Sequence, residues 1–140
     1  MLKIFFDASV IIAALLSPSG GSAKLLQLAK KKALAAITSQ TVIDEVLKHQ
    51  QKIQKTKKEI EEFLIQNPFL IRQKIKANEA KKYQRLIDAD DCHLIAGANL
   101  TKCQYLVTLD KKHLLTKTAQ NSVKPLKMVS PKELIAELLN

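Results

Sequence analysis

The chain has 140 residues, of which 46% are hydrophobic and 26% charged, and this composition is typical of a globular domain and excludes an intrinsically disordered chain. Three Gly and four Pro also exclude a collagen-like or linker-like chain. The 23 Lys and Arg outnumber the 13 Asp and Glu. The net charge of +10 indicates a polyanionic partner, most often a nucleic acid, although such a charge can also serve as a solubilising surface. We expect residues 1–140 to form a single domain.

The first half of the chain alternates strand and helix patterns. Residues 3–6 are a short apolar run closed by Asp7, which predicts a buried strand. The pattern then predicts, in chain order, a helix over residues 8–16, a break over 17–22, a helix over 23–32, a strand over 34–37, a helix from the N-cap Ser39 to about Gln51, and a helix over 55–65.

The second half continues this alternation. It predicts a weak strand over residues 69–73, a helix over 77–86, a helix that opens at 88–91, a strand over 105–109, a lysine-rich loop, a strand over 126–129 and a terminal helix. Ser130 and Glu133 form the capping box of this last helix. Alternating strands and helices predict a doubly wound α/β fold, with a mostly parallel sheet covered on both faces. Ligands of such sheets bind beyond the carboxyl ends of the strands, where the strand order reverses.

Two acidic residues follow predicted strands directly. Asp7 comes after the first strand and Asp110 after the strand over 105–109, so we expect both at the edge of the sheet where α/β sites are built. Either residue alone could simply cap the next helix. Carboxylates that lie close together resist ionisation unless a cation sits between them. Two such acids in a basic chain therefore point to a cation site.

Three more acids open the helix after residue 88. Asp91 lies three, four and seven positions before Leu94, Ile95 and Ala98, which form the apolar stripe of this helix. We therefore expect its side chain to lie above this stripe and to lean toward the sheet. Asp90 aligns with His93 and Gly97, and we expect it to be exposed and to face away from the stripe. Asp88 lies at or before the start of the helix, where it could cap the helix or support a ligand.

Glu45 borders the apolar face of its predicted helix, one turn from Val42, although its position alone does not distinguish it from a solvated acid. The three histidines, at positions 49, 93 and 113, do not share metal-ligand spacing. Carboxylates without Cys or His partners suit Mg²⁺ or Mn²⁺ rather than zinc. Such an ion polarises a phosphodiester and lowers the pKa of a bound water.

Four segments together resemble the motifs of PIN-domain ribonucleases. Residues 2–10 are similar to the first motif, with Asp7 and Ser9, and residues 39–47 to the second, with Glu45. Residues 88–98 are similar to the third motif, with Asp91, and residues 107–115 to the fourth, with Thr108 and Asp110. The fourth motif often has Gly before its Asp, where this chain has Leu109. Four motifs in the family's order make the resemblance specific.

The resemblance implies a PIN-like three-layer α/β/α fold and cleavage of RNA with Mg²⁺ or Mn²⁺. It implies four catalytic, metal-binding residues: Asp7, Glu45, Asp91 and Asp110. Ser9, Asp88 and Thr108 are candidates for a supporting role next to them. The small VapC-like toxin nucleases of type II toxin–antitoxin operons are the most similar members, and they imply a homodimer and a cognate antitoxin.

Two other functions remain open from the sequence. A PIN-like module could bind RNA or a protein partner without cutting. A receiver-type signalling domain also uses acids at strand ends, but it expects two adjacent acids after the first strand, where this chain has Phe6 and Asp7. Cys92 and Cys103 have no zinc-finger spacing, and no apolar run approaches the ~20 residues of a membrane span. We therefore expect a cytoplasmic protein with no membrane partner.

Overall fold

Five parallel strands form one sheet in the computed structural model, which describes residues 1–140. Their order across the sheet is β3-β2-β1-β4-β5, and every neighbouring pair is parallel. All five predicted strands exist, with these bounds: β1 (Lys3–Phe6), β2 (Ala35–Ser39), β3 (Phe69–Arg72), β4 (Tyr105–Val107) and β5 (Lys127–Val129). The predicted α/β fold with a parallel sheet is thus confirmed.

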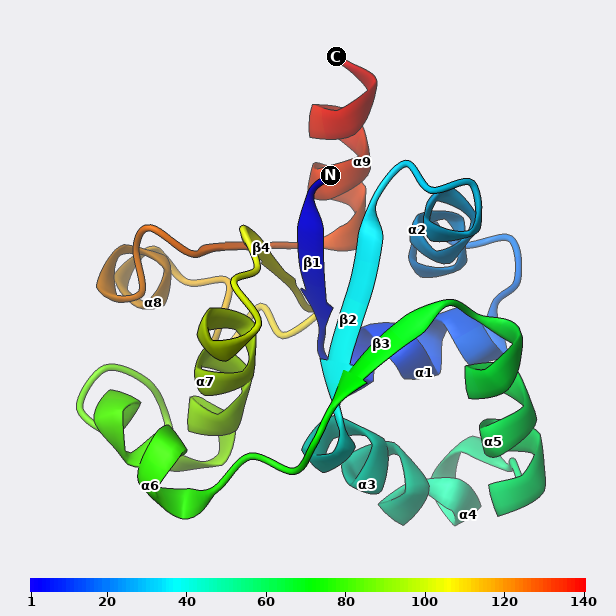
Figure 1. The fold of residues 1–140 in the computed structure, drawn as a ribbon, viewed down its shortest axis with the longest axis horizontal. Helices are drawn as coiled ribbons and strands as arrows, with labels where there is room; N and C mark the ends of the chain where they lie inside the picture. Colours follow the sequence, from blue (N-terminus) through cyan, green and yellow to red (C-terminus); the bar gives the residue numbers. More distant parts are fainter.

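Helices cover both faces of this sheet (Figure 1). They are α1 (Ala8–Leu16), α2 (Gly21–Lys30), α3 (Gln40–Lys48), α4 (Gln50–Ile53), α5 (Lys57–Gln66), α6 (Ala77–Ala80), α7 (Cys92–Leu100), α8 (Lys117–Ser122) and α9 (Pro131–Leu139). The chain crosses the sheet in one direction from β1 to β3 and in the other from β3 to β5, so right-handed connections place the two sets of helices on opposite faces. Figure 1 accordingly shows α1, α2 and α5 on one side and α7 and α8 on the other.

No single helix is long and apolar enough to cross a membrane. Helices α1 and α2 reach the required length and composition only when taken together, and they are bent by 94° at the break between them.

The core is centred on β1, where Ile4, Phe5 and Phe6 are fully buried. Helix α7 packs directly on this strand and on β4. Gly97 of α7 lies so close to Phe5 that an added Cβ would come within 2.6 Å of the ring. The small side chains of α7 therefore let the helix approach the sheet closely, and this approach fixes the position of the acids at its start.

Two predicted helix starts are confirmed by their caps. The Ser39 hydroxyl accepts a hydrogen bond from the Val42 N–H at 3.2 Å. Ser130 and Glu133 each accept a hydrogen bond from the other's backbone N–H, which completes the predicted capping box of α9. Local side-chain chemistry thus sets where these helices begin.

Three predicted segments differ in the structure. The helix expected from Ser39 to about Gln51 ends at Lys48, and α4 follows as a separate turn. The helix expected over residues 77–86 is one α-turn followed by a 3₁₀ turn, and the strand expected over 105–109 ends at Val107. Helix α8 was not predicted, because Ala119 is its only buried residue and so it shows no apolar period.

The strand order reverses between β1 and β4. The chain leaves β1 toward β2 on one side and later returns from β3 to β4 on the other side. Phe6 is in register with Val107, so the residues that follow them, Asp7 and Thr108, lie at the same level beyond the sheet. In folds of this class the crevice at such a reversal is where ligands bind.

Candidate active site

Asp7 lies at the carboxyl end of β1 and is 7% exposed. Its Oδ1 accepts a hydrogen bond from the Ala8 N–H at 2.7 Å, so it caps α1, as a strand-end acid often does. Its Oδ2 accepts hydrogen bonds from the hydroxyls of Ser9 at 3.1 Å and Thr108 at 2.7 Å. The Asp7 carboxylate is therefore held rigidly from β1, α1 and the end of β4.

The same two hydroxyls organise the loop after β4. Thr108, which is fully buried, also accepts a hydrogen bond from the Asp110 N–H at 3.1 Å. Ser9 accepts one from the Leu109 N–H at 3.1 Å. These bonds connect the ends of β1 and β4, so they place Asp110 next to Asp7 although the two are far apart in the chain.

Asp110 stabilises the turn at which the chain enters the lysine-rich segment after β4. Its Oδ1 accepts hydrogen bonds from the backbone N–H groups of Lys112 at 3.1 Å and His113 at 2.9 Å. Its Oδ2 lies 3.3 Å from His113 Nδ1. With 28% of its side chain exposed, Asp110 is more open to solvent than Asp7.

Asp91 lies at the end of the 3₁₀ turn Ala89–Asp91, directly before α7. Its pKa is raised from 3.8 to about 6, mainly by burial and then by the negative charges of Asp7, Asp110 and Asp88, while His113 lowers it. A carboxyl feels such repulsion only when other carboxylates are close. The structure therefore brings Asp7, Asp91 and Asp110 to one place, with Asp88 beside them.

Glu45 joins the same site from α3, which follows β2. Burial raises the pKa of this half-buried carboxyl, and the charge of Asp7 raises it further. His49 and Lys48 lower the pKa, and Asp90 raises it again. Glu45 therefore lies within electrostatic range of Asp7, near the carboxyl ends of β1 and β2.

The predicted phase of α7 is right for Asp90 and wrong for two residues that were expected beside it. Asp90 is exposed, as expected. Gly97, however, packs against Phe5, and His93 is largely buried, with an Nδ1 that has no hydrogen-bond partner. The helix is buried around most of its surface, and it begins with a 3₁₀ turn, whose tighter winding breaks the 3.6-residue phase. The sequence reasoning missed His93 because it assigned one buried stripe to this helix.

The donor chemistry of this site fits a hard divalent cation. Its side chains supply carboxylate and hydroxyl oxygens, which Mg²⁺ and Mn²⁺ prefer. The neighbouring Cys92 thiol donates to the Ile87 and Asp88 carbonyls, and burial raises its pKa, so it is not a thiolate ligand. No three His, Cys, Asp or Glu side chains stand in a coordinating arrangement in the structure. Burial is the main cause of the raised Asp91 pKa, and the remaining rise comes from repulsion by Asp7, Asp110 and Asp88, which a bound cation would relieve.

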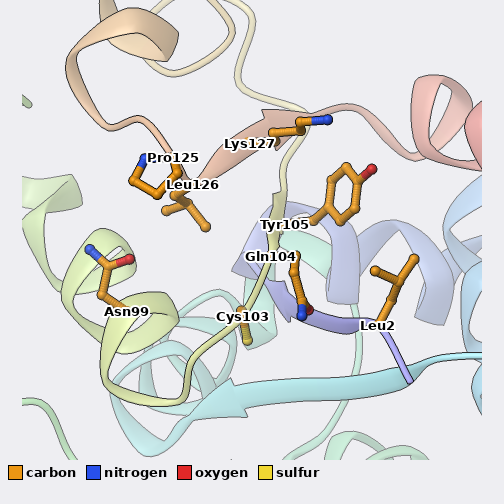
Figure 2. Close-up of a pocket in the computed structure, with 8 residues that line it drawn as sticks. All are labelled: Leu2, Asn99, Cys103, Gln104, Tyr105, Pro125, Leu126 and Lys127. Atoms are coloured by element: carbon orange, nitrogen blue, oxygen red, sulfur yellow. The ribbon is translucent and has the colours of Figure 1, made fainter.

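A cavity lies at the opposite ends of the strands (Figure 2). This cavity of about 360 Å³ is lined by residues at or before the amino ends of β1, β4 and β5, among them Leu2, Gln104 and Lys127. Figure 2 shows no acidic side chain around it. The acidic crevice is therefore the better candidate for an active site.

Solved structures of several proteins share this fold. PAE2754 from Pyrobaculum aerophilum is 14% identical, with a TM-score of 0.65 over 99% of this chain and 96% of that chain. VapBC2 from Rickettsia felis, solved bound to a DNA fragment from their promoter, is 15% identical, with a TM-score of 0.66 over 92% and 98%. VapC20 from Mycobacterium tuberculosis, described as a Sarcin-Ricin loop cleaving toxin, is 12% identical, with a TM-score of 0.57 over 78% and 91%.

The sequence itself matches no curated protein. It does match the family model of the PIN domain over residues 3–112, a stretch that includes all four acids of the crevice. This match leaves no support for the receiver-type alternative. Since the match extends over most of the chain, this protein belongs to the PIN-domain family.

Proposed function

We propose that this protein is a divalent-metal-dependent ribonuclease. The observation that carries the proposal is the link through Thr108 between Asp7 and Asp110 at the carboxyl ends of β1 and β4, together with the partly buried Asp91, whose pKa is raised by burial and then by the charges of these two acids. Carboxylates that repel one another in a +10 protein are suited to hold a cation beside a phosphodiester. Membership of the PIN-domain family supports a nuclease.

Four residues would hold Mg²⁺ or Mn²⁺: Asp7, Glu45, Asp91 and Asp110. When bound, the ion supplies Lewis acidity and an activated water for hydrolysis of the phosphodiester. Ser9 and Thr108 fix the Asp7 carboxylate by hydrogen bonds, so that it does not need to reorganise when a cation arrives. Asp88 adds negative charge next to Asp91 and so raises the affinity of the site for a cation.

Exposed lysines next to the acids support RNA as the substrate. Lys111 and Lys112 directly follow Asp110 and are exposed. They offset the repulsion between the carboxylates and a phosphate backbone, which is the main obstacle to binding RNA at an acidic crevice.

A toxin of a toxin–antitoxin pair is the specific form of this proposal. Two of the similar structures are VapBC2 and VapC20, and the second is described as a toxin. The partners would be a cognate antitoxin and a second copy of this chain. Exposed apolar side chains at the end of α5 and on β3 offer a surface for either partner: Ile65, Leu70 and Ile71. Sedimentation that finds only a monomer at high micromolar concentration would contradict the homodimer.

The test is cleavage of a fluorescent single-stranded RNA by the purified chain. We expect cleavage with Mg²⁺ or Mn²⁺, none after removal of metal by EDTA, and full recovery when Mg²⁺ is returned in excess. A DNA strand of the same sequence serves as the matched substrate. RNA that binds tightly but stays intact with either metal would instead identify a non-catalytic RNA-binding PIN domain.

A further inference from the structure

A pocket of about 340 Å³ opens beside the acidic crevice, at the place where α2 and α9 both begin. The loop after β4 forms a wall shared by the two sites. Leu109 and Lys111 line the pocket, whereas Asp110 between them belongs to the crevice. The Leu109 N–H also donates to the Ser9 hydroxyl, which holds Asp7. A ligand in the pocket therefore lies next to the carboxylates.

The start of α2 presents free hydrogen-bond donors to this pocket. Its N-cap is Gly20, which has no side chain to cap the helix. The backbone N–H groups of Gly21, Ser22 and Ala23 make no hydrogen bond in the structure. Helix α9 differs, because Ser130 and Glu133 cap it. Uncapped N–H groups at the positive end of a helix dipole favour an anion.

The Ser22 hydroxyl is a second, independent sign of a missing ligand. Ser22 is 6% exposed and lines the pocket, yet its hydroxyl has no hydrogen-bond partner in the protein. The only partnerless polar side-chain atom that is fully closed off from solvent is His93 Nδ1. The Ser22 oxygen therefore reaches the space of the pocket. This hydroxyl has no acceptor in the protein, and a ligand acceptor bound in the pocket would supply the missing bond.

The charge around the pocket is positive. Lys111 and Lys132 are the charged residues that line it, and neither forms an ion pair. No acidic side chain lines the pocket, in contrast to the crevice next to it. Ala13, Leu109 and Pro131 add an apolar wall. The pocket thus combines donors for an anion with a surface on which a ribose or base can pack.

We propose that this pocket binds a backbone phosphate of the RNA strand next to the phosphate at the carboxylates. Ser22, the free N–H groups of α2, Lys111 and Lys132 are its donors. The identity of the ligand as RNA rests on the proposed function, whereas the anion site rests on the pocket itself. Leu109, where the family's motif often has Gly, packs against the neighbouring nucleotide.

Gly20→Asp tests the site without risk to the fold. Gly20 has φ of −81° and ψ of 173°, which any residue adopts. An added Cβ would lie 3.1 Å from the Ser17 hydroxyl, which can shift by side-chain rotation, and at an ordinary 3.5 Å from the Ser17 Cβ and carbonyl oxygen. A carboxylate at the N-cap would accept the free N–H bonds and stabilise α2, while it occupies the place of the phosphate. Ser19→Asp is the matched control, because it adds the same charge one residue away but does not line the pocket.

The measurement is fluorescence anisotropy of a labelled single-stranded RNA in EDTA over a range of salt. We expect Gly20→Asp to keep or raise the Tm, to weaken RNA binding more than Ser19→Asp does, and to reduce the salt slope by about 0.7, the value for one phosphate contact on a single strand. Ser22→Ala should also weaken binding, with the salt slope less affected, because it removes a neutral donor.

Equal affinities for Gly20→Asp and Ser19→Asp would overturn the subsite. Cleavage of RNA with Mg²⁺ by the unchanged chain is measured beside these binding curves. If cleavage occurs but the two variants bind alike, the subsite is wrong and the proposed function stands. If Gly20→Asp selectively weakens binding but no cleavage occurs, the subsite stands and the nuclease proposal fails.

Discussion

The Thr108 hydroxyl donates a hydrogen bond of 2.7 Å to Asp7 Oδ2, although 101 positions separate the two residues in the chain. Both are buried, and Thr108 also accepts the Asp110 N–H. One hydroxyl thus connects the acid after β1 to the acid after β4. The geometry of the crevice depends on this bond, because it sets the orientation of Asp7 and the path of the loop that carries Asp110.

Thr108→Val should therefore destabilise the fold and disturb the site together. Valine keeps the shape of threonine but leaves a carboxylate oxygen and the Asp110 N–H without this partner. We expect a loss of about 1–3 kcal/mol in the free energy of unfolding, the usual cost of an unsatisfied buried polar group. Urea denaturation measures the loss. Thr108→Ser restores the hydroxyl and should recover most of it; equal losses in both variants would show that packing, not the hydrogen bond, matters here.

Asp91→Asn should separate catalysis from folding. The amide keeps the size of the side chain but is a poor ligand for a hard cation. Cleavage of RNA with Mg²⁺ should drop by orders of magnitude, whereas RNA binding should hold or tighten, because one negative charge near the phosphate is gone. Asp90→Asn is the matched control and should change cleavage little, since Asp90 is exposed. Loss of cleavage in Asp90→Asn with activity intact in Asp91→Asn would refute the assignment.

The pKa of Asp91 also predicts how stability changes with pH in the absence of metal. Its pKa is about 6 in the folded protein against 3.8 ordinarily, so the folded state holds the proton more tightly than the unfolded state. This contribution to stability is present at low pH and is lost as pH rises from about 4 to about 6. The free energy of unfolding of Asp91→Asn should equal that of the unchanged chain at about pH 4. At neutral pH it should be higher than that of the unchanged chain by on the order of 1 kcal/mol, a modest gain because the carboxyl is only half-buried. Equal stabilities at neutral pH would contradict the burial of Asp91.

Added Mg²⁺ should restore the folding stability that is lost when Asp91 ionises. Protons and the cation compete for Asp91 and Glu45, whose pKa values are both raised. The rise in Tm on adding Mg²⁺ should therefore be larger at neutral pH than at about pH 5, where part of these carboxyls is protonated. Differential scanning fluorimetry measures both shifts. Asp91→Asn should show a much smaller rise at neutral pH, and a rise as large as in the unchanged chain would argue against a metal at this crevice.

Gly97→Ala tests the close contact between α7 and β1. The added Cβ would come within 2.6 Å of the Phe5 ring, which is fully buried and cannot move away freely. We expect a loss of about 1–3 kcal/mol in the free energy of unfolding, as for other overpacked cores. Gly21→Ala is the control, because its Cβ would meet Ile135 and Pro131 at an ordinary 3.7 Å. Thermal unfolding of both variants should show a lowered Tm for Gly97→Ala alone.

Much of the fold could be predicted from local sequence. Short apolar runs gave the positions of all five strands, and side-chain caps gave the starts of α3 and α9. These signals are local, since a strand buried on both faces must be apolar and a helix start needs an acceptor for its free N–H groups. Helix α8 escaped prediction because it buries a single residue, so its sequence carries no period.

The sequence predicted Asp7, Glu45, Asp91 and Asp110 as site residues by their places after strands or at helix starts and by the four PIN-like motifs. Helical phase, in contrast, failed for His93 and Gly97. A helical-wheel projection of α7 assumes one buried stripe. In the structure a 3₁₀ turn directly precedes this helix, and most of the helix surface is buried. Which side of a helix is buried depends on what packs against it, and the sequence of the helix does not contain that information.

The sequence by itself determined the strand and helix order, the acids at the strand ends and the positive charge, because each depends on residues close together in the chain. Only the tertiary structure decided which acids lie close enough to affect one another's pKa. The pKa of Asp91 is raised by burial and then by Asp7 and Asp110, which follow the two strands at the reversal of the sheet. The uncapped start of α2 likewise becomes a pocket only where α9 and the loop after β4 close around it. Burial and charge repulsion act through space, and the fold sets those distances.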